Sequence, residues 1–67
     1  MNFENIFNKI RSDFVGRRIK VRAVPDQEFI GILKRCDSAG NLSIQTDEFG
    51  LVLIQRQYVA TVMLVSE

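Results

Sequence analysis

The stretch over residues 19–41 constrains the fold most. Two apolar runs are separated by a turn at residues 24–27, where Pro25 has a backbone angle suited to the second position of a turn. The second run carries Gly31 in its middle. A glycine inside a strand indicates a sharp bend, because the missing side chain lets a curved sheet fold over itself. The sequence therefore predicts two consecutive strands, of which the second is strongly bent.

The remaining periodicity predicts three more strands and one helix. The strands are expected at about 17–24, 28–36, 41–46, 51–55 and 59–65. Apolar residues recur at helical spacing from Phe3 to Phe14 and predict a helix over about 2–13, with Asn2 as its N-cap and Gly16 beyond its end. We expect one mostly-β domain over residues 1–67. An N-terminal α-helix would cover one end of a strongly bent five-stranded antiparallel sheet, an open barrel of the SH3 type.

Strict alternation divides the side chains of the predicted strand over 28–36 between two faces. One face holds Phe29, Gly31 and Leu33, and the other holds Ile30, Ile32, Lys34 and Cys36. Cys36 is the single cysteine of the chain, and we interpret it as a small core hydrophobe rather than a reactive thiol. An unpaired cysteine is typical of a reducing, cytoplasmic setting.

The chain is too short to bury all of its apolar residues alone. It has 67 residues, of which 46% are hydrophobic, and a domain of this size buries only about 60% of its unfolded surface. With one cysteine and no histidine, neither an internal disulfide nor the usual Cys/His metal site is expected. The predicted strands over 51–55 and 59–65 are apolar on both faces, as in strands buried on both sides. We therefore expect copies of the chain to pair through these two strands.

Charge is distributed unevenly along the chain, although the net charge is only +1. Residues 1–22 carry six basic and two acidic side chains, whereas the remainder carries three basic and six acidic ones. Such asymmetry can make one face of the molecule basic. Four of the basic residues are candidate phosphate contacts, or else solubilising charges on exposed positions: Lys9, Arg11, Arg17 and Arg18.

The spacing of particular residues resembles the two signature motifs of the Sm/LSm family, which includes bacterial Hfq. The first motif is matched by Ile19, Val21, Gly31, Leu33, Asp37 and Asn41. The second motif reads apolar-Arg-Gly-Asp-Asn-apolar in Sm and LSm proteins, whereas residues 54–59 read Ile-Gln-Arg-Gln-Tyr-Val. In Hfq this turn reads Tyr-Lys-His, and Arg56 and Gln57 fall where its Lys-His would lie. The resemblance implies a small barrel that assembles into an RNA-binding ring.

The resemblance also implies an RNA site where the two motifs meet at the pore of the ring. The amide of Asn41 would read a base edge and Asp37 would brace the loop, unless both simply cap a tight turn. Arg56 would contribute charge or a stacking plane. Gln55 stands at the family's arginine and Ala39 at its stacking position, so the usual base sandwich is incomplete. Gln57 and Tyr58 complete the candidate set, although Gln57 also fits a solvated turn and Tyr58 a packing role.

No pattern in the chain indicates catalysis or a cofactor. The sequence has no histidine, phosphate-binding glycine loop or nucleophile elbow, and its carboxylates are scattered through predicted turns. No apolar run approaches the roughly 20 residues of a membrane span. The leading hypothesis is a homo-oligomeric Sm-like ring of five to seven subunits, the order being open. It would bind single-stranded U-rich or A-rich RNA, as an RNA chaperone or ribonucleoprotein scaffold.

Two alternatives use the same fold differently. One is an Sm-fold oligomer with a degenerate base pocket that serves as a protein-interaction or structural module, as the alanine at position 39 and the glutamine at 55 would allow. The other is a monomeric SH3-like barrel. The oligomeric state of the purified chain distinguishes the monomer from both ring hypotheses.

Overall fold

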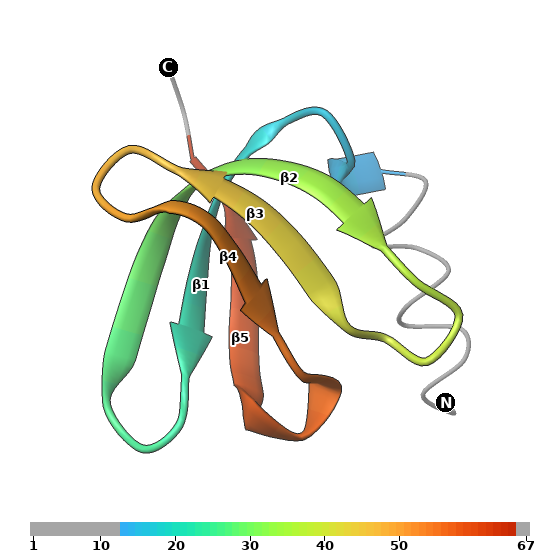
Figure 1. Cartoon of the computed structure of the whole chain (residues 1–67), viewed down its shortest axis with the longest axis vertical. Coiled ribbons are helices and arrows are strands. Elements are labelled where there is room, and N and C mark those ends of the chain that lie inside the picture. The colour runs from blue at the N-terminus through green and yellow to red at the C-terminus, as the bar shows by residue number, and fades with distance from the viewer. Residues whose placement is uncertain (1–12, 66–67) are drawn as a thin grey trace.

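The computed structural model describes residues 13–65, whose strands form one bent antiparallel sheet (Figure 1). The elements are β1 (Arg18–Ala23), β2 (Gln27–Cys36), β3 (Leu42–Thr46), β4 (Gly50–Ile54), a turn of 3₁₀ helix termed η1 (Arg56–Tyr58), and β5 (Val59–Leu64). The strands lie in the order β4-β3-β2-β1-β5. The prediction of a mostly-β fold with five antiparallel strands is confirmed. The helix predicted over 2–13 falls outside the described residues, apart from Asp13.

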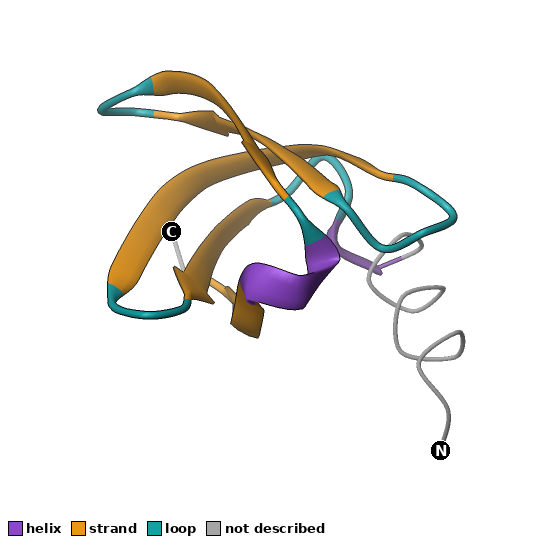
Figure 2. Ribbon diagram, turned by 60° about the horizontal axis from the view of Figure 1, so that its bottom comes forward, coloured by secondary structure: helices purple, strands orange, loops and turns teal. Residues whose placement is uncertain are grey.

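Gly31 allows the sheet to bend. It pairs with Ile19 of β1 on one side and with Thr46 of β3 on the other. A Cβ atom at this position would lie 2.1 Å from the carbonyl oxygen of Gln45, so no residue but glycine fits without a shift of the backbone. The absent side chain lets β3 cross close to β2, which arches along its length (Figure 2). The bent sheet predicted from this glycine is confirmed.

The core lies on the inner face of the curved sheet. Side chains from all strands except β5 are buried there, because alternate residues of each strand point inward. They are Ile19, Val21, Ala23, Leu33, Cys36, Leu42, Ile44 and Ile54. Half-buried side chains pack around them, including Phe14 ahead of β1 and both Val59 and Val62 of β5. This packing fixes the ends of β2, β3 and β4, from which the polar loops described below extend.

A β-bulge at Lys34 overturns part of the predicted face assignment. Leu33 pairs with Ile44, but the next pair along β2 is Arg35 with Ser43, so the ladder skips Lys34. An extra residue in one strand shifts the alternation that follows it. Cys36 is therefore buried on the same face as Leu33, not on the face of Ile30 and Ile32 as strict alternation predicted. Its interpretation as a small core residue is confirmed.

The chain enters β1 through a turn held against β2. The N–H of Gly16 donates to the carbonyl oxygen of Leu33 at 2.8 Å, and the N–H of Arg17 donates to that of Phe14 at 3.0 Å. Gly16 has a φ of 86°, in the region that favours glycine. Phe14 packs against the core, which ties this turn to the sheet.

The two edges of the sheet are β4 and β5, and both expose apolar side chains. Leu51 and Leu53 of β4 are 60% and 72% exposed, and Met63 and Leu64 of β5 are 54% and 42% exposed. An edge strand presents unpaired N–H and C=O groups, and a long apolar edge is a template for pairing with another chain. The strands that the sequence predicted to be apolar on both faces are thus the ones that have a neighbouring strand on one side only among residues 13–65.

Candidate nucleic-acid interface

The loop between β2 and β3 is organised around the carboxylate of Asp37. Its Oδ1 accepts hydrogen bonds from the backbone N–H groups of Ala39 and Asn41, at 3.0 and 2.9 Å. Its Oδ2 accepts one from Nδ2 of Asn41 at 3.1 Å. The pKa of Asp37 is lowered, chiefly by the hydrogen bond from the backbone N–H of Asn41, while desolvation of the carboxylate acts in the opposite direction. The Asn41 side chain and the N–H groups of Ala39 and Gly40 lower the pKa further. These bonds favour the ionised carboxylate and hold the loop closed.

Asn41 joins this loop to the turn after β4. Its Oδ1 accepts a hydrogen bond from the backbone N–H of Arg56 at 2.9 Å, while its Nδ2 donates to Asp37. A carboxylate only accepts and a backbone N–H only donates, so the two partners fix which end of the amide is oxygen and which is nitrogen. One N–H and one lone pair of the amide have no partner among the described residues. They remain available to a ligand.

A shallow depression lies beside this junction. It is lined by Arg35, Asp37, Asn41, Leu42, Ser43, Leu53, Ile54 and Gln55. The structure therefore brings together Asp37, Asn41 and Gln55, which the sequence placed in one site, and ties the backbone of Arg56 to them. The Arg56 side chain is exposed on η1. The loop and the turn thus lie side by side within one subunit.

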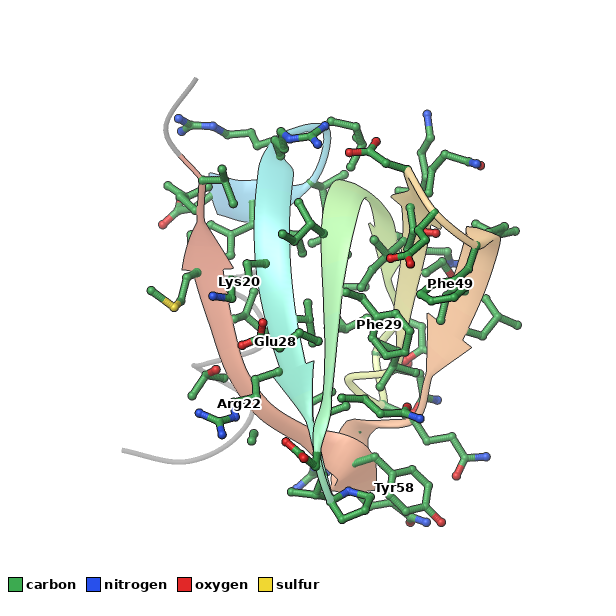
Figure 3. All side chains as sticks on the ribbon, turned by 90° about the vertical axis from the view of Figure 1, so that its left-hand side faces the viewer. Lys20, Arg22, Glu28, Phe29, Phe49 and Tyr58 are labelled. Atoms are coloured by element: carbon green, nitrogen blue, oxygen red, sulfur yellow. The ribbon has the colours of Figure 1, made fainter. Side chains whose placement is uncertain are left out.

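Tyr58 and Gln57 do not line that depression. Tyr58 lines a second hollow with Val24, Gln27 and Phe29, and its carbonyl oxygen accepts from the N–H of Val24 at 2.8 Å. Figure 3 shows Tyr58 at the end of the molecule where β1 turns into β2. Gln57 is exposed on η1 and is not among the residues that line either hollow. The two hollows share Leu53, Ile54 and Gln55, and a stacking role for the Tyr58 ring stays a prediction.

Two of the four predicted phosphate contacts lie within the described residues. Arg17 and Arg18 lie at the start of β1, the opposite end of that strand from its contact with η1. Arg17 is exposed, but the guanidinium of Arg18 forms an ion pair with both carboxylate oxygens of Asp47, which competes with any phosphate. Lys9 and Arg11 lie outside the described residues. The nearest cation to the Asn41 loop that the sequence analysis missed is Arg35, which belongs to neither motif.

Residues 13–65 hold no group of three or more side chains that could bind a metal ion. In that part of the chain, no helix has the length and apolar character needed to cross a membrane. The polar groups that line the depression are amides, a carboxylate, a hydroxyl and a guanidinium.

Comparison with known proteins bears on the fold. No protein-family model matches the sequence, and no curated protein sequence matches it. Among solved structures, the chain is similar to a novel Sm-like archaeal protein from Pyrobaculum aerophilum, with 18% identity and a TM-score of 0.75 over 97% of this chain. The chain has an Sm-like fold. It spans only 52% of the length of the Pyrobaculum protein.

A second solved structure supports the same fold over nearly its full length. The Sm-like fold of this chain matches a heptameric archaeal Sm protein with 22% identity and a TM-score of 0.70, covering 82% of this chain and 94% of that one. The Sm/LSm resemblance read from the motifs is thus confirmed at the level of the fold. The resemblance to the Hfq-related branch of the family stays a prediction.

Proposed function

We propose that this chain is a single Sm-like domain that assembles into a homo-oligomeric ring and binds single-stranded RNA, acting as an RNA chaperone or a ribonucleoprotein scaffold. The observation that carries the proposal is the Asn41 amide, which bridges Asp37 and the Arg56 backbone and keeps one N–H and one lone pair. A fixed donor beside a fixed acceptor matches the edge of a base. We further propose a cytoplasmic setting and no enzymatic role.

Assembly is supported by the two sheet edges. β4 and β5 lie at opposite ends of the strand order, and both expose leucine side chains. Pairing β4 of one copy with β5 of the next would satisfy their backbone groups and reduce the exposure of the apolar side chains along the seam, as in strand addition generally. The heptameric archaeal Sm protein supports a ring, but the number of subunits in this protein is a matter for measurement.

Ring symmetry would repeat the weak RNA site of each subunit, so that several sites together would bind one strand more tightly than one site alone. Each copy would place one Asn41 and one Arg56 turn around a common axis, so an RNA strand could contact several sites at once. Linked sites raise the overall affinity well above that of one site. U-rich and A-rich strands are the substrates that we propose to test first.

Fluorescence anisotropy with labelled oligo-U, oligo-A and mixed RNA at two salt concentrations tests the binding. We expect micromolar affinity or better at low salt, and a roughly 5- to 100-fold loss in Asn41→Ala, since a bidentate base contact is worth about 1–3 kcal/mol. Gln45→Ala removes an exposed amide from β3 outside the depression and serves as the control. Absence of binding at low salt would refute the RNA proposal.

A protein-interaction or structural ring is the second candidate. It is favoured by Ala39, which offers no stacking ring, and by the engagement of the Asn41 amide in two internal hydrogen bonds. This candidate predicts a stable ring in which Asn41→Ala and Arg56→Ala leave partner binding and cellular function intact. Loss of RNA retention in those two variants would exclude it.

A further inference from the structure

The depression beside Asn41 contains a cation that neither motif includes. Arg35 lines it together with Asp37, Asn41 and Gln55. Its side chain is exposed and forms no hydrogen bond or ion pair with another residue of the described segment 13–65. An exposed guanidinium without a protein partner next to an amide with spare hydrogen-bonding capacity is suited to a planar ligand.

The β-bulge at Lys34 determines the face on which Arg35 lies. Continuing the alternation from the buried Leu33 would turn Arg35 toward the core, but the skipped residue reverses this. Arg35 instead pairs with Ser43, and Ser43 pairs with Leu53 of β4. Directly paired residues of neighbouring strands share a face of the sheet. Arg35, Ser43 and Leu53 therefore form one row across β2, β3 and β4 on the outer face.

This row has the shape of a slot. Neighbouring strands lie about 4.8 Å apart, so β2 and β4 are separated by about 10 Å across β3. Ser43 has a small side chain and forms the floor, while the longer side chains of Arg35 and Leu53 form the two walls. A stacked base occupies about 3.4 Å, which leaves room for one base between the walls. Asn41 lines the same depression as these three residues.

We propose that a base of single-stranded RNA enters this slot and stacks on the guanidinium of Arg35, with its edge against the spare N–H and lone pair of Asn41. This inference rests on the proposed RNA-binding function and deepens it. The Sm resemblance assigns stacking to the positions of Ala39 and Gln55, neither of which has a ring or a guanidinium. Arg35 supplies from β2 the planar group that those two positions lack.

The test compares two substitutions that separate stacking from charge. Arg35→Ala removes both the plane and the charge, whereas Arg35→Lys keeps the charge alone. Binding of fluorescein-labelled oligo-U is measured by anisotropy over a range of salt concentrations. We expect both variants to lose roughly 5- to 100-fold in affinity with an unchanged salt slope, because stacking accounts for about this factor per base. Lys34→Ala, which removes an exposed cation one residue away, is expected to stay within about threefold of the unmodified chain.

Each other outcome rejects either the proposed RNA binding or the stacking role of Arg35. If the unmodified chain binds no RNA, the proposed function fails and this inference fails with it. If Asn41→Ala weakens binding while Arg35→Ala does not, the function stands and the role of Arg35 is rejected. If Arg35→Lys restores full affinity, or Arg35→Ala lowers the salt slope by about 0.7, Arg35 contacts phosphate and the stacking assignment is wrong. Light scattering and urea unfolding of each variant exclude loss of assembly or folding as the cause.

Discussion

The polar junction, formed by Asp37, Asn41 and the Arg56 backbone, differs from the apolar edges of the sheet in how many of its groups find a partner within one chain. At the junction, Asp37, Asn41 and the Arg56 backbone satisfy one another through hydrogen bonds of 2.9–3.1 Å. At the edges, the apolar side chains of β4 and β5 remain exposed and the outer backbone groups have no strand beside them. The junction is formed within the subunit, whereas the edges are open to pairing with a second copy.

This difference separates the geometry of the proposed site from assembly. The orientation of the Asn41 amide is set by two partners in its own subunit, so a monomer already carries a formed site. A ring would add repetition and avidity without having to build the pocket. Variants that damage the edge should therefore lower RNA affinity through loss of multivalency, while variants at the junction should lower it at each site.

Gly31→Ala should have the largest effect, because it disturbs both regions at once. The new Cβ would lie 2.1 Å from the Gln45 carbonyl oxygen, which forces β3 away from β2. We expect a loss of unfolding free energy of about 3 kcal/mol or more, at the upper end of overpacking costs. Urea unfolding followed by circular dichroism measures it.

Gly50→Ala is the matched control for that substitution. A Cβ at Gly50 meets nothing within 4 Å, and its φ of 75° alone should cost about 1–2 kcal/mol. Equal losses in the two variants would show that β3 does not approach β2 as closely as the structure indicates.

Leu64→Glu should break the apolar edge while leaving the junction intact. Leu64 lies on the edge strand β5 and is 42% exposed in the single chain, so pairing with another copy would bury it. A carboxylate buried there without a partner is strongly unfavourable. We expect light scattering to show a mass near 7.7 kDa, that of one chain, and oligo-U affinity to fall with it.

Gln27→Glu, which adds the same charge at the exposed first residue of β2, should keep the assembly. Retention of the full oligomer in Leu64→Glu would contradict pairing through β5. An unchanged affinity for a single-site dinucleotide in the monomeric variant would support a site formed within one subunit.

Asn41→Ala should have a smaller effect, confined to the junction. It removes two side-chain hydrogen bonds and leaves the Arg56 N–H without its acceptor. We expect a loss of about 1–2 kcal/mol in unfolding free energy, which lowers Tm by about 4–8 °C per kcal/mol in a domain of this size. The oligomeric mass should not change, and a dissociated ring in this variant would mean that junction and edge are coupled.

Asn41→Asp sharpens the same measurement. The new carboxylate would face Asp37 across the 3.1 Å now spanned by the amide bond. Two ionised carboxylates at that separation repel each other, so this variant should be less stable than Asn41→Ala at neutral pH and should recover on acidification.

The sheet could be predicted from the sequence because its signals are local and strong. Alternating apolar residues predict the strands, and a mid-strand glycine predicts the bend, without knowledge of which strands pair. Most of the junction followed from the Asp-x-x-x-Asn spacing, since an Asx carboxylate typically accepts from backbone N–H groups a few residues onward. The motif also predicted that the two loops meet, and the Asn41–Arg56 bond agrees with it.

Two features could not be predicted from the sequence, and the reason is the same for both. The bulge at Lys34 depends on how β2 pairs with β3, and strict alternation gives no sign of it. The direction of Arg35 and the face of Cys36 both follow from that bulge, so the first was missed and the second was misassigned, although the burial of Cys36 was predicted. Nor did the sequence indicate that Tyr58 lines a second hollow with Val24 and Phe29, next to the depression beside Asn41.

The pH dependence of the junction should be the smallest effect and the most specific. Three hydrogen bonds to its carboxylate, led by the Asn41 backbone N–H, hold the folded-state pKa of Asp37 below its ordinary value. A lowered folded pKa contributes stability that is fully present above the unfolded pKa, near 4, and is lost as the pH falls through the folded value. Amide chemical shifts of Ala39 and Asn41, followed from pH 7 to pH 2, should report this loss, while the edge strands keep their shifts over the same range. Asp37→Asn should abolish the titration at both amides; a transition that persists in this variant would assign the junction's pH response to another group.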